Sequence, residues 1–153
     1  MKAVLLRVGR GRTSWADDGV ADYSRRLSRM KYEELLIKPA RFSGDVEAVR
    51  TQEAARILQK IKPGDRLIAL DERGDLITTE EMAGLVRSAA SASTRRIVFA
   101  IGGPYGHGAV VREKAHKVVA LSGMVLNHEL ARVVLVEQLY RVSTLLWGGS
   151  YHH

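Results

Sequence analysis

The sequence predicts an α/β fold in which a parallel-type sheet is flanked by helices. Segments with strand character alternate with segments of helical spacing along the whole chain. Three strand segments, "RLIAL" at 66–70, "IVFAI" at 97–101 and "VVAL" at 118–121, are almost continuously apolar. Strands of this kind are buried on both faces, as in a parallel sheet covered by helices. The length of 153 residues fits one domain over residues 1–153.

The individual elements follow from hydrophobic spacing and from the residues that end each segment. Strands are expected at 2–8, 32–38, 66–70, 95–101 and 118–122. Helices are expected at 14–30, 49–61, 78–90, 110–116 and 129–147. The segment "DERGD" at 71–75 is expected to form a turn after the third strand. Thr78 and Glu81 have the spacing of a capping box at the start of the third helix.

The helix expected at 129–147 is apolar around most of its circumference, interrupted only by Arg132, Glu137 and Arg141. Glu137 and Arg141 are spaced to form an ion pair. A helix that is apolar on most sides is buried on most sides. A subunit interface is the simplest cover for its second face, so we expect a homodimer. The alternative is a central core helix in a monomer.

The formal net charge of +7 favours a polyanionic partner such as nucleic acid. Basic residues cluster near the first strand and helix, and the candidates for contacting RNA phosphates are Arg7, Arg10, Arg25 and Arg26. The alternative is an ordinary solvated face. The chain has no cysteine, which excludes disulfides and thiolate chemistry. Its apolar runs are too short to span a bilayer, so we expect a cytoplasmic protein with no membrane partner.

Two segments partly resemble known cofactor-binding or metal-binding motifs, but neither matches its motif in full. The glycine loop "IGGPYGHG" at 101–108 lacks the Gly-Lys-Ser/Thr ending of a phosphate-binding loop and the spacing of a dinucleotide fingerprint. The segment "HELAR" at 128–132 has Arg132 where the zinc-protease helix has its second histidine. We therefore expect no metal site and no nicotinamide or ATP.

Three segments that follow predicted strands have unusual contents: "ALDERG" at 69–74, "IGGPYGHG" at 101–108 and "LSGMVLNH" at 121–128. Ligands of α/β sheets bind outside the carboxyl ends of strands, so these loops are expected to build one pocket. Arg73 and His107 are the only basic side chains before His128 in the three loops. A nucleoside-like ligand without phosphates fits this composition. His107 itself is expected to lie on the surface.

The segments "IGGPYG", "LSGMVLNHELARVVLVEQLYR" and "YHH" resemble small SPOUT-class methyltransferases, which methylate N3 of a pseudouridine in a hairpin loop of large-subunit (23S) ribosomal RNA. The resemblance spans the whole chain. It implies a C-terminal trefoil knot, a homodimer, ribosomal RNA or the assembled ribosome as substrate, and S-adenosyl-L-methionine as cofactor. By the family's motif, the cofactor contacts fall on Leu70, Gly102, Gly103, Leu121, Ser122, Gly123, Met124, Val125 and Leu126.

Methyl transfer to an imide nitrogen needs alignment and either a base or donors that stabilise the developing charge. The candidates for catalysis are His128, Arg132, Tyr151 and His152. His128 has the alternative of satisfying a backbone group, and Arg132 that of an interface ion pair. Asn127 replaces the family's usual proline, and as a good helix cap it should preserve the helix start. Two alternatives remain: a non-catalytic RNA- or ribosome-binding protein on this fold, and a knotted tRNA methyltransferase.

Overall fold

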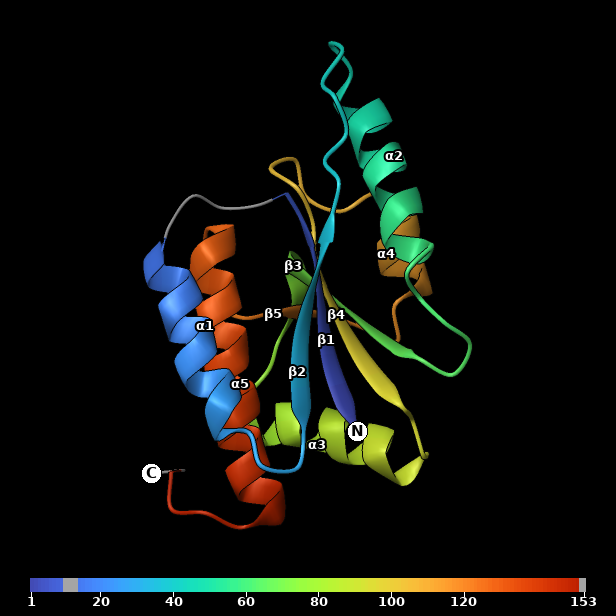
Figure 1. The fold of residues 1–153 in the computed structure, drawn as a ribbon. Coiled ribbons are helices and arrows are strands. Elements are labelled where there is room, and N and C mark those ends of the chain that lie inside the picture. Colours follow the sequence, from blue (N-terminus) through green and yellow to red (C-terminus); the bar gives the residue numbers. More distant parts are fainter. Residues whose placement is uncertain (10–13, 152–153) are drawn as a thin grey trace.

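The computed structural model describes residues 1–9 and 14–151, which form one five-stranded parallel sheet with helices on both faces (Figure 1). The predicted α/β class with a parallel-type sheet is confirmed. The strand order is β2-β1-β4-β3-β5. The elements in chain order are β1 (Lys2–Val8), α1 (Ser14–Arg26), β2 (Lys31–Ile37), α2 (Val46–Leu58), β3 (Arg66–Leu76), α3 (Thr79–Ser91), β4 (Arg96–Ile101), α4 (Ala109–Lys114), β5 (Lys117–Ala120) and α5 (His128–Trp147).

Alternate residues of the strands face two separate hydrophobic clusters, one on each side of the sheet. In β1, Leu5 packs with α3 and α5, whereas Leu6 packs with α2 and α4. Figure 1 shows the same layers, with α1 and α5 side by side on one face. Both clusters are fully apolar at their centres, which explains why the strands read as continuous hydrophobic runs.

The caps predicted at Thr78 and Asn127 are present, and they fix two helix starts. The side chain of Asn127 accepts a hydrogen bond from Leu130 N, so α5 begins at His128. Thr78 and Glu81 form the predicted capping box of α3. Three helices end earlier than expected, at Arg26, Leu58 and Lys114, and tighter turns with i,i+3 hydrogen bonds follow each of them.

The segment 71–75 continues β3, and the prediction of a turn there was wrong. The strand runs on to Leu76, with a shift in its pairing to β5 between Leu70 and Asp75. A side chain at Gly74 would place its Cβ 2.6 Å from the backbone nitrogen of Val119. Gly74 therefore permits a close pairing between β3 and β5. From the sequence alone, the same glycine indicates the end of a strand.

Helix α5 packs against α1 and α3, and its buried side includes Leu135 and Leu139. Leu130 and Leu145 remain 42% and 37% exposed on its outer side. The predicted pair between Glu137 and Arg141 is present. Within the described residues, no helix is both long enough and apolar enough to cross a membrane.

Candidate functional site

A cavity of about 510 Å³ lies at the carboxyl ends of β3, β4 and β5. It lies where the sequence predicts a pocket formed by three loops. Of the nine residues predicted to contact a cofactor, only Gly123 is not part of the lining; the other eight are Leu70, Gly102, Gly103, Leu121, Ser122, Met124, Val125 and Leu126. The volume falls within the roughly 300–1,000 Å³ typical of small-molecule sites.

Gly102 lines this cavity, and the loop's own backbone also restricts its space. A Cβ at Gly102 would lie 2.7 Å from the carbonyl carbon of Gly106 and 2.9 Å from His107 N. At Gly103 a Cβ would lie 2.4 Å from Glu53 Oε2. The predicted ligand-facing glycines are thus required by the tight packing of the loop as well as by the cavity.

Two buried polar side chains support the glycine loop from behind. Glu53 on α2 is 3% exposed, and its Oε1 accepts a hydrogen bond from Ala40 N. His107 is also 3% exposed, with Nε2 2.9 Å from Ala100 O, so its predicted surface position was wrong. Burial lowers the pKa of His107, so the imidazole is neutral at neutral pH. Both side chains position the glycine loop. The glycine motif in the sequence does not indicate that Glu53 and His107 have this role.

The rim of the cavity carries paired charges. Asp71 accepts hydrogen bonds from the backbone and side chain of Arg73, and Arg112 lies 3.7 Å from the same carboxylate. Burial raises the pKa of Asp71, but the hydrogen bonds and charge of Arg73 lower it more, to about 2. This pairing neutralises Arg73 at the cavity, which agrees with a ligand that lacks phosphate.

His128, a predicted catalytic residue, is the first residue of α5 and lines the cavity. Burial lowers its pKa, and the charges of Glu129 and Glu53 oppose that shift without reversing it. The imidazole is therefore neutral at pH 7 and can accept a proton from a group in the cavity.

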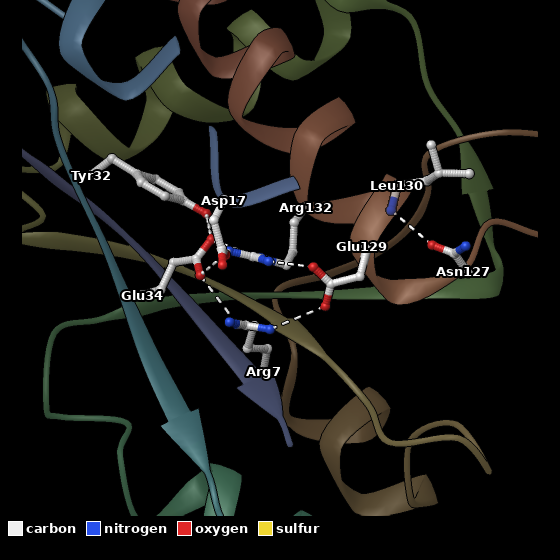
Figure 2. A network of polar contacts seen from close by, with 8 residues as sticks. All are labelled: Arg7, Asp17, Tyr32, Glu34, Asn127, Glu129, Leu130 and Arg132. Carbon is white, nitrogen blue, oxygen red and sulfur yellow. Dashed lines mark hydrogen bonds and ion pairs between the residues drawn. The ribbon is translucent and has the colours of Figure 1, made fainter. Parts of the chain in front are cut away.

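Arg132 is 3% exposed, and a buried charge network behind the cavity holds its guanidinium (Figure 2). It donates to Glu34 at 2.9 Å and to Asp17 at 2.8 Å, and it pairs with Glu129. Burial alone would lower the pKa of Arg132, but these hydrogen bonds raise it. Its donors face carboxylates of its own chain and it does not line the cavity, so its position fits an ion pair within the subunit better than catalysis or the interface pair given as the alternative.

Arg7 belongs to the same network, which corrects its expected place on an exposed basic face. It is 7% exposed, with Nε 3.1 Å from Glu34 and Nη1 donating to Glu129 at 3.3 Å. In contrast, Arg25 and Arg26 are exposed on the last turn of α1, where both lie near Asp22. Arg10 lies outside the described residues.

Tyr151 packs against its own chain, away from the cavity lining. Its ring lies 4.6 Å from the ring of Tyr140, its hydroxyl donates to that of Tyr23 at 3.3 Å, and Arg141 covers its face. The hydrogen bond with Tyr23 raises its pKa to about 12. His152, the remaining catalytic candidate, lies outside the described residues. Among residues 1–9 and 14–151, no group of three or more potential metal ligands is found.

Known proteins resemble this chain over its whole length. The protein named Ribosomal RNA large subunit methyltransferase H from Geobacter sp. (strain M21) is 38% identical over 153 residues, covering 100% of this chain and 99% of the relative. A protein of the same name from Syntrophotalea carbinolica is 40% identical over 155 residues, with coverages of 100% and 99%.

A solved structure and a family model extend the comparison. The crystal structure of a probable methyltransferase from Bordetella pertussis Tohama I superposes with a TM-score of 0.59 at 14% identity, covering 93% of this chain and 95% of that chain. That likeness supports the fold alone. A family model described as "Predicted SPOUT methyltransferase" matches residues 1–152. The chain therefore belongs to the SPOUT methyltransferase family.

Proposed function

We propose that this protein is an S-adenosyl-L-methionine-dependent methyltransferase that modifies large-subunit ribosomal RNA, at N3 of a pseudouridine in a hairpin loop of 23S RNA. The observation that carries the proposal is the convergence of three strand-end loops on one cavity of about 510 Å³. The names of the full-length relatives support the RNA substrate. We propose that residues 1–153 act as one methyltransferase domain in the cytoplasm, where ribosomes are found.

The chemistry of the cavity fits S-adenosyl-L-methionine. Apolar side chains of Leu70, Leu121 and Leu126 would hold the adenine, and the glycine loop offers backbone groups at close range. The paired charges of Asp71 and Arg73 leave no unpaired cation for a phosphate at this point of the rim. When bound, the cofactor supplies an electrophilic methyl group on a sulfonium.

His128 is the residue that we propose to accept the N3 proton of the substrate base. An imide nitrogen attacks poorly until its proton leaves, and His128 is neutral and lines the cavity. Transfer of that proton to Nδ1 or Nε2 of His128 would free the N3 lone pair for the methyl group that the bound cofactor would supply. Asn127 caps the helix that begins at His128, which fixes the backbone at this position.

Replacing His128 with alanine is expected to lower the methyl-transfer rate by about 10²–10⁴-fold, the usual contribution of a general base. Cofactor affinity should change little. Burial lowers the pKa of His128 in the unmodified protein, so the rate should stay high at neutral pH and fall only as the pH drops through this lowered pKa. Single-turnover rates against pH, with an NMR titration of His128, test both. A rate unchanged by the substitution would exclude His128 as the base.

The assembly proposed here is a homodimer with a trefoil knot formed by the C-terminal segment. Exposed Leu130 and Leu145 on α5 support a second subunit on that face. The tail that contains Tyr151 and His152 follows two glycines, Gly148 and Gly149. In such a dimer we propose that this tail completes the cavity of the other subunit. Arg25 and Arg26, which are exposed, and Arg10 remain the proposed contacts for RNA phosphates.

The experiment that tests the function measures cofactor binding by calorimetry and maps methyl incorporation. We expect binding, and incorporation on large ribosomal subunits in preference to tRNA. A protein that binds ribosomes without binding the cofactor would support the non-catalytic alternative. Incorporation on tRNA alone would support the tRNA methyltransferase. Comparing assembled subunits with naked RNA identifies the substrate form.

A further inference from the structure

A second cavity, of about 850 Å³, lies at the opposite edge of the sheet from the methyl-transfer cavity. We call it the amino-edge pocket, because its lining includes residues where strands begin. Four basic side chains, Lys2, Arg29, Lys31 and Arg95, line it together with Trp147. Among the described residues, no carboxylate belongs to this lining. An 850 Å³ cavity with cations and an aromatic wall has the chemistry of a nucleotide site.

The sheet itself concentrates positive charge at this edge. Lys2 of β1 pairs in register with Lys31 of β2 and with Arg96 of β4. Because the strands are parallel, their first residues all reach the same edge of the sheet. Lys2 is neutralised by Glu33 at 2.6 Å, and Arg96 by Asp65.

Three cations of the pocket remain available for a ligand. Arg29, Lys31 and Arg95 are exposed, and within residues 1–9 and 14–151 their side chains have no ion-pair partner. Unpaired basic side chains that converge on one hollow repel one another, and an anion relieves that repulsion.

Trp147 adds an aromatic surface to the wall. It is the last residue of α5, and it packs only partly against the hydrophobic cluster beneath it. In the part of the chain that the structure describes, nothing accepts its indole N–H. A partly buried indole beside cations offers a nucleobase a stacking face on its open side, while the backbone phosphates of the RNA meet the charges.

We infer that the amino-edge pocket binds single-stranded RNA, with phosphates at Arg29, Lys31 and Arg95 and a base stacked on Trp147. The inference rests on the proposed function for its choice of RNA as the anion. The pocket adjoins the end of α1, where Arg25 and Arg26 are exposed and pair with Asp22. Seven-residue β1 separates the two cavities by roughly 20 Å. A substrate must therefore be several nucleotides long, or folded, to occupy both.

The test uses Trp147 as its own reporter. The chain has two tryptophans, so a Trp15→Phe background leaves Trp147 as the sole indole fluorophore. A short oligouridylate should quench its emission. In the same background, Arg29→Glu, Lys31→Glu and Arg95→Glu together should weaken binding at least about tenfold and reduce the salt slope of log K by about 2. The matched control, Lys60→Glu, Lys62→Glu and Lys114→Glu, changes the net charge equally on exposed sites near α2 and α4 and should bind as the parent does.

Three results would overturn the inference. One is equal quenching and affinity in the two triple variants. Another is competition by inorganic phosphate as strong as that by the oligonucleotide, which indicates a simple anion site. The third is a changed oligomeric state of the pocket variant in sedimentation, which indicates that a second subunit occupies the pocket. Quenching without any methyl incorporation on ribosomal RNA would instead refute the proposed function and leave the pocket standing.

Discussion

Replacing Gly102 with alanine is expected to abolish cofactor binding and to destabilise the fold. The added Cβ would lie 2.7 Å from the carbonyl carbon of Gly106, and its three nearest atoms all belong to the backbone of Gly106 and His107, so it has no flexible side chain to displace. The cost of such overpacking is about 1–3 kcal/mol. The loop must shift, and Gly102 lines the cavity, so its wall moves with it. Calorimetric titration with the cofactor and thermal unfolding measure the two effects.

Gly84→Ala provides the matched control, since it makes the same chemical change in a different setting. Gly84 lies within α3 and is exposed, and a Cβ at this position would have no neighbouring atom within 4 Å. Alanine there should stabilise the helix by about 1 kcal/mol and leave cofactor affinity unchanged. Circular dichroism shows whether the Gly102 variant is folded at the titration temperature. Normal affinity in that folded variant would refute the assignment of the cavity as the cofactor site.

Replacing Arg132 with methionine should produce the largest loss of stability, about 3–5 kcal/mol. The substitution removes the guanidinium that pairs with Glu34 and Glu129 and leaves their charges poorly compensated in the interior. Denaturant unfolding at neutral pH measures the loss.

Two further variants separate this mechanism from a simple loss of packing. Adding Glu34→Gln to the Arg132→Met protein should recover part of the stability, because one of the uncompensated charges is then removed. Lys117→Ala breaks an exposed pair with Asp75 and should have little effect. If Glu34→Gln worsened the loss, repulsion between uncompensated carboxylates would not be its cause.

Local signals in the sequence were sufficient for most of the fold. Strand-forming segments located all five strands, three of them as almost continuous apolar runs, and short-range hydrogen-bonding residues such as Asn127 and Thr78 located helix starts. These features depend on residues within one helical turn or one strand, so a short stretch of sequence is enough to predict them. The three strand-end loops that line the cavity were predictable for the same reason, since parallel strands end at one edge.

Long-range partners account for the errors. In the sequence Arg7 resembles a surface cation. Its partner Glu129 is distant in the chain, so the local sequence does not indicate their hydrogen bond. His107 is polar and follows a glycine, yet the loop folds it back to Ala100 O. The glycine at position 74 led to the prediction of a turn. A side chain is excluded there by the backbone of Val119, which belongs to another strand and so is not visible in the local sequence. Glu53 gave no signal at all, because its role depends on Gly103 and Ala40.

The place of β1 in the sheet has a consequence for biosynthesis. β1 pairs with β2 on one side and with β4 on the other, and β4 alone joins the β2–β1 pair to β3 and β5. At about 5–20 residues per second, Arg96 follows β1 out of the translating ribosome only after about 5–20 s. During that interval the apolar edge of β1 is open to pairing with other nascent chains. The risk of aggregation is therefore concentrated in synthesis, before the sheet closes.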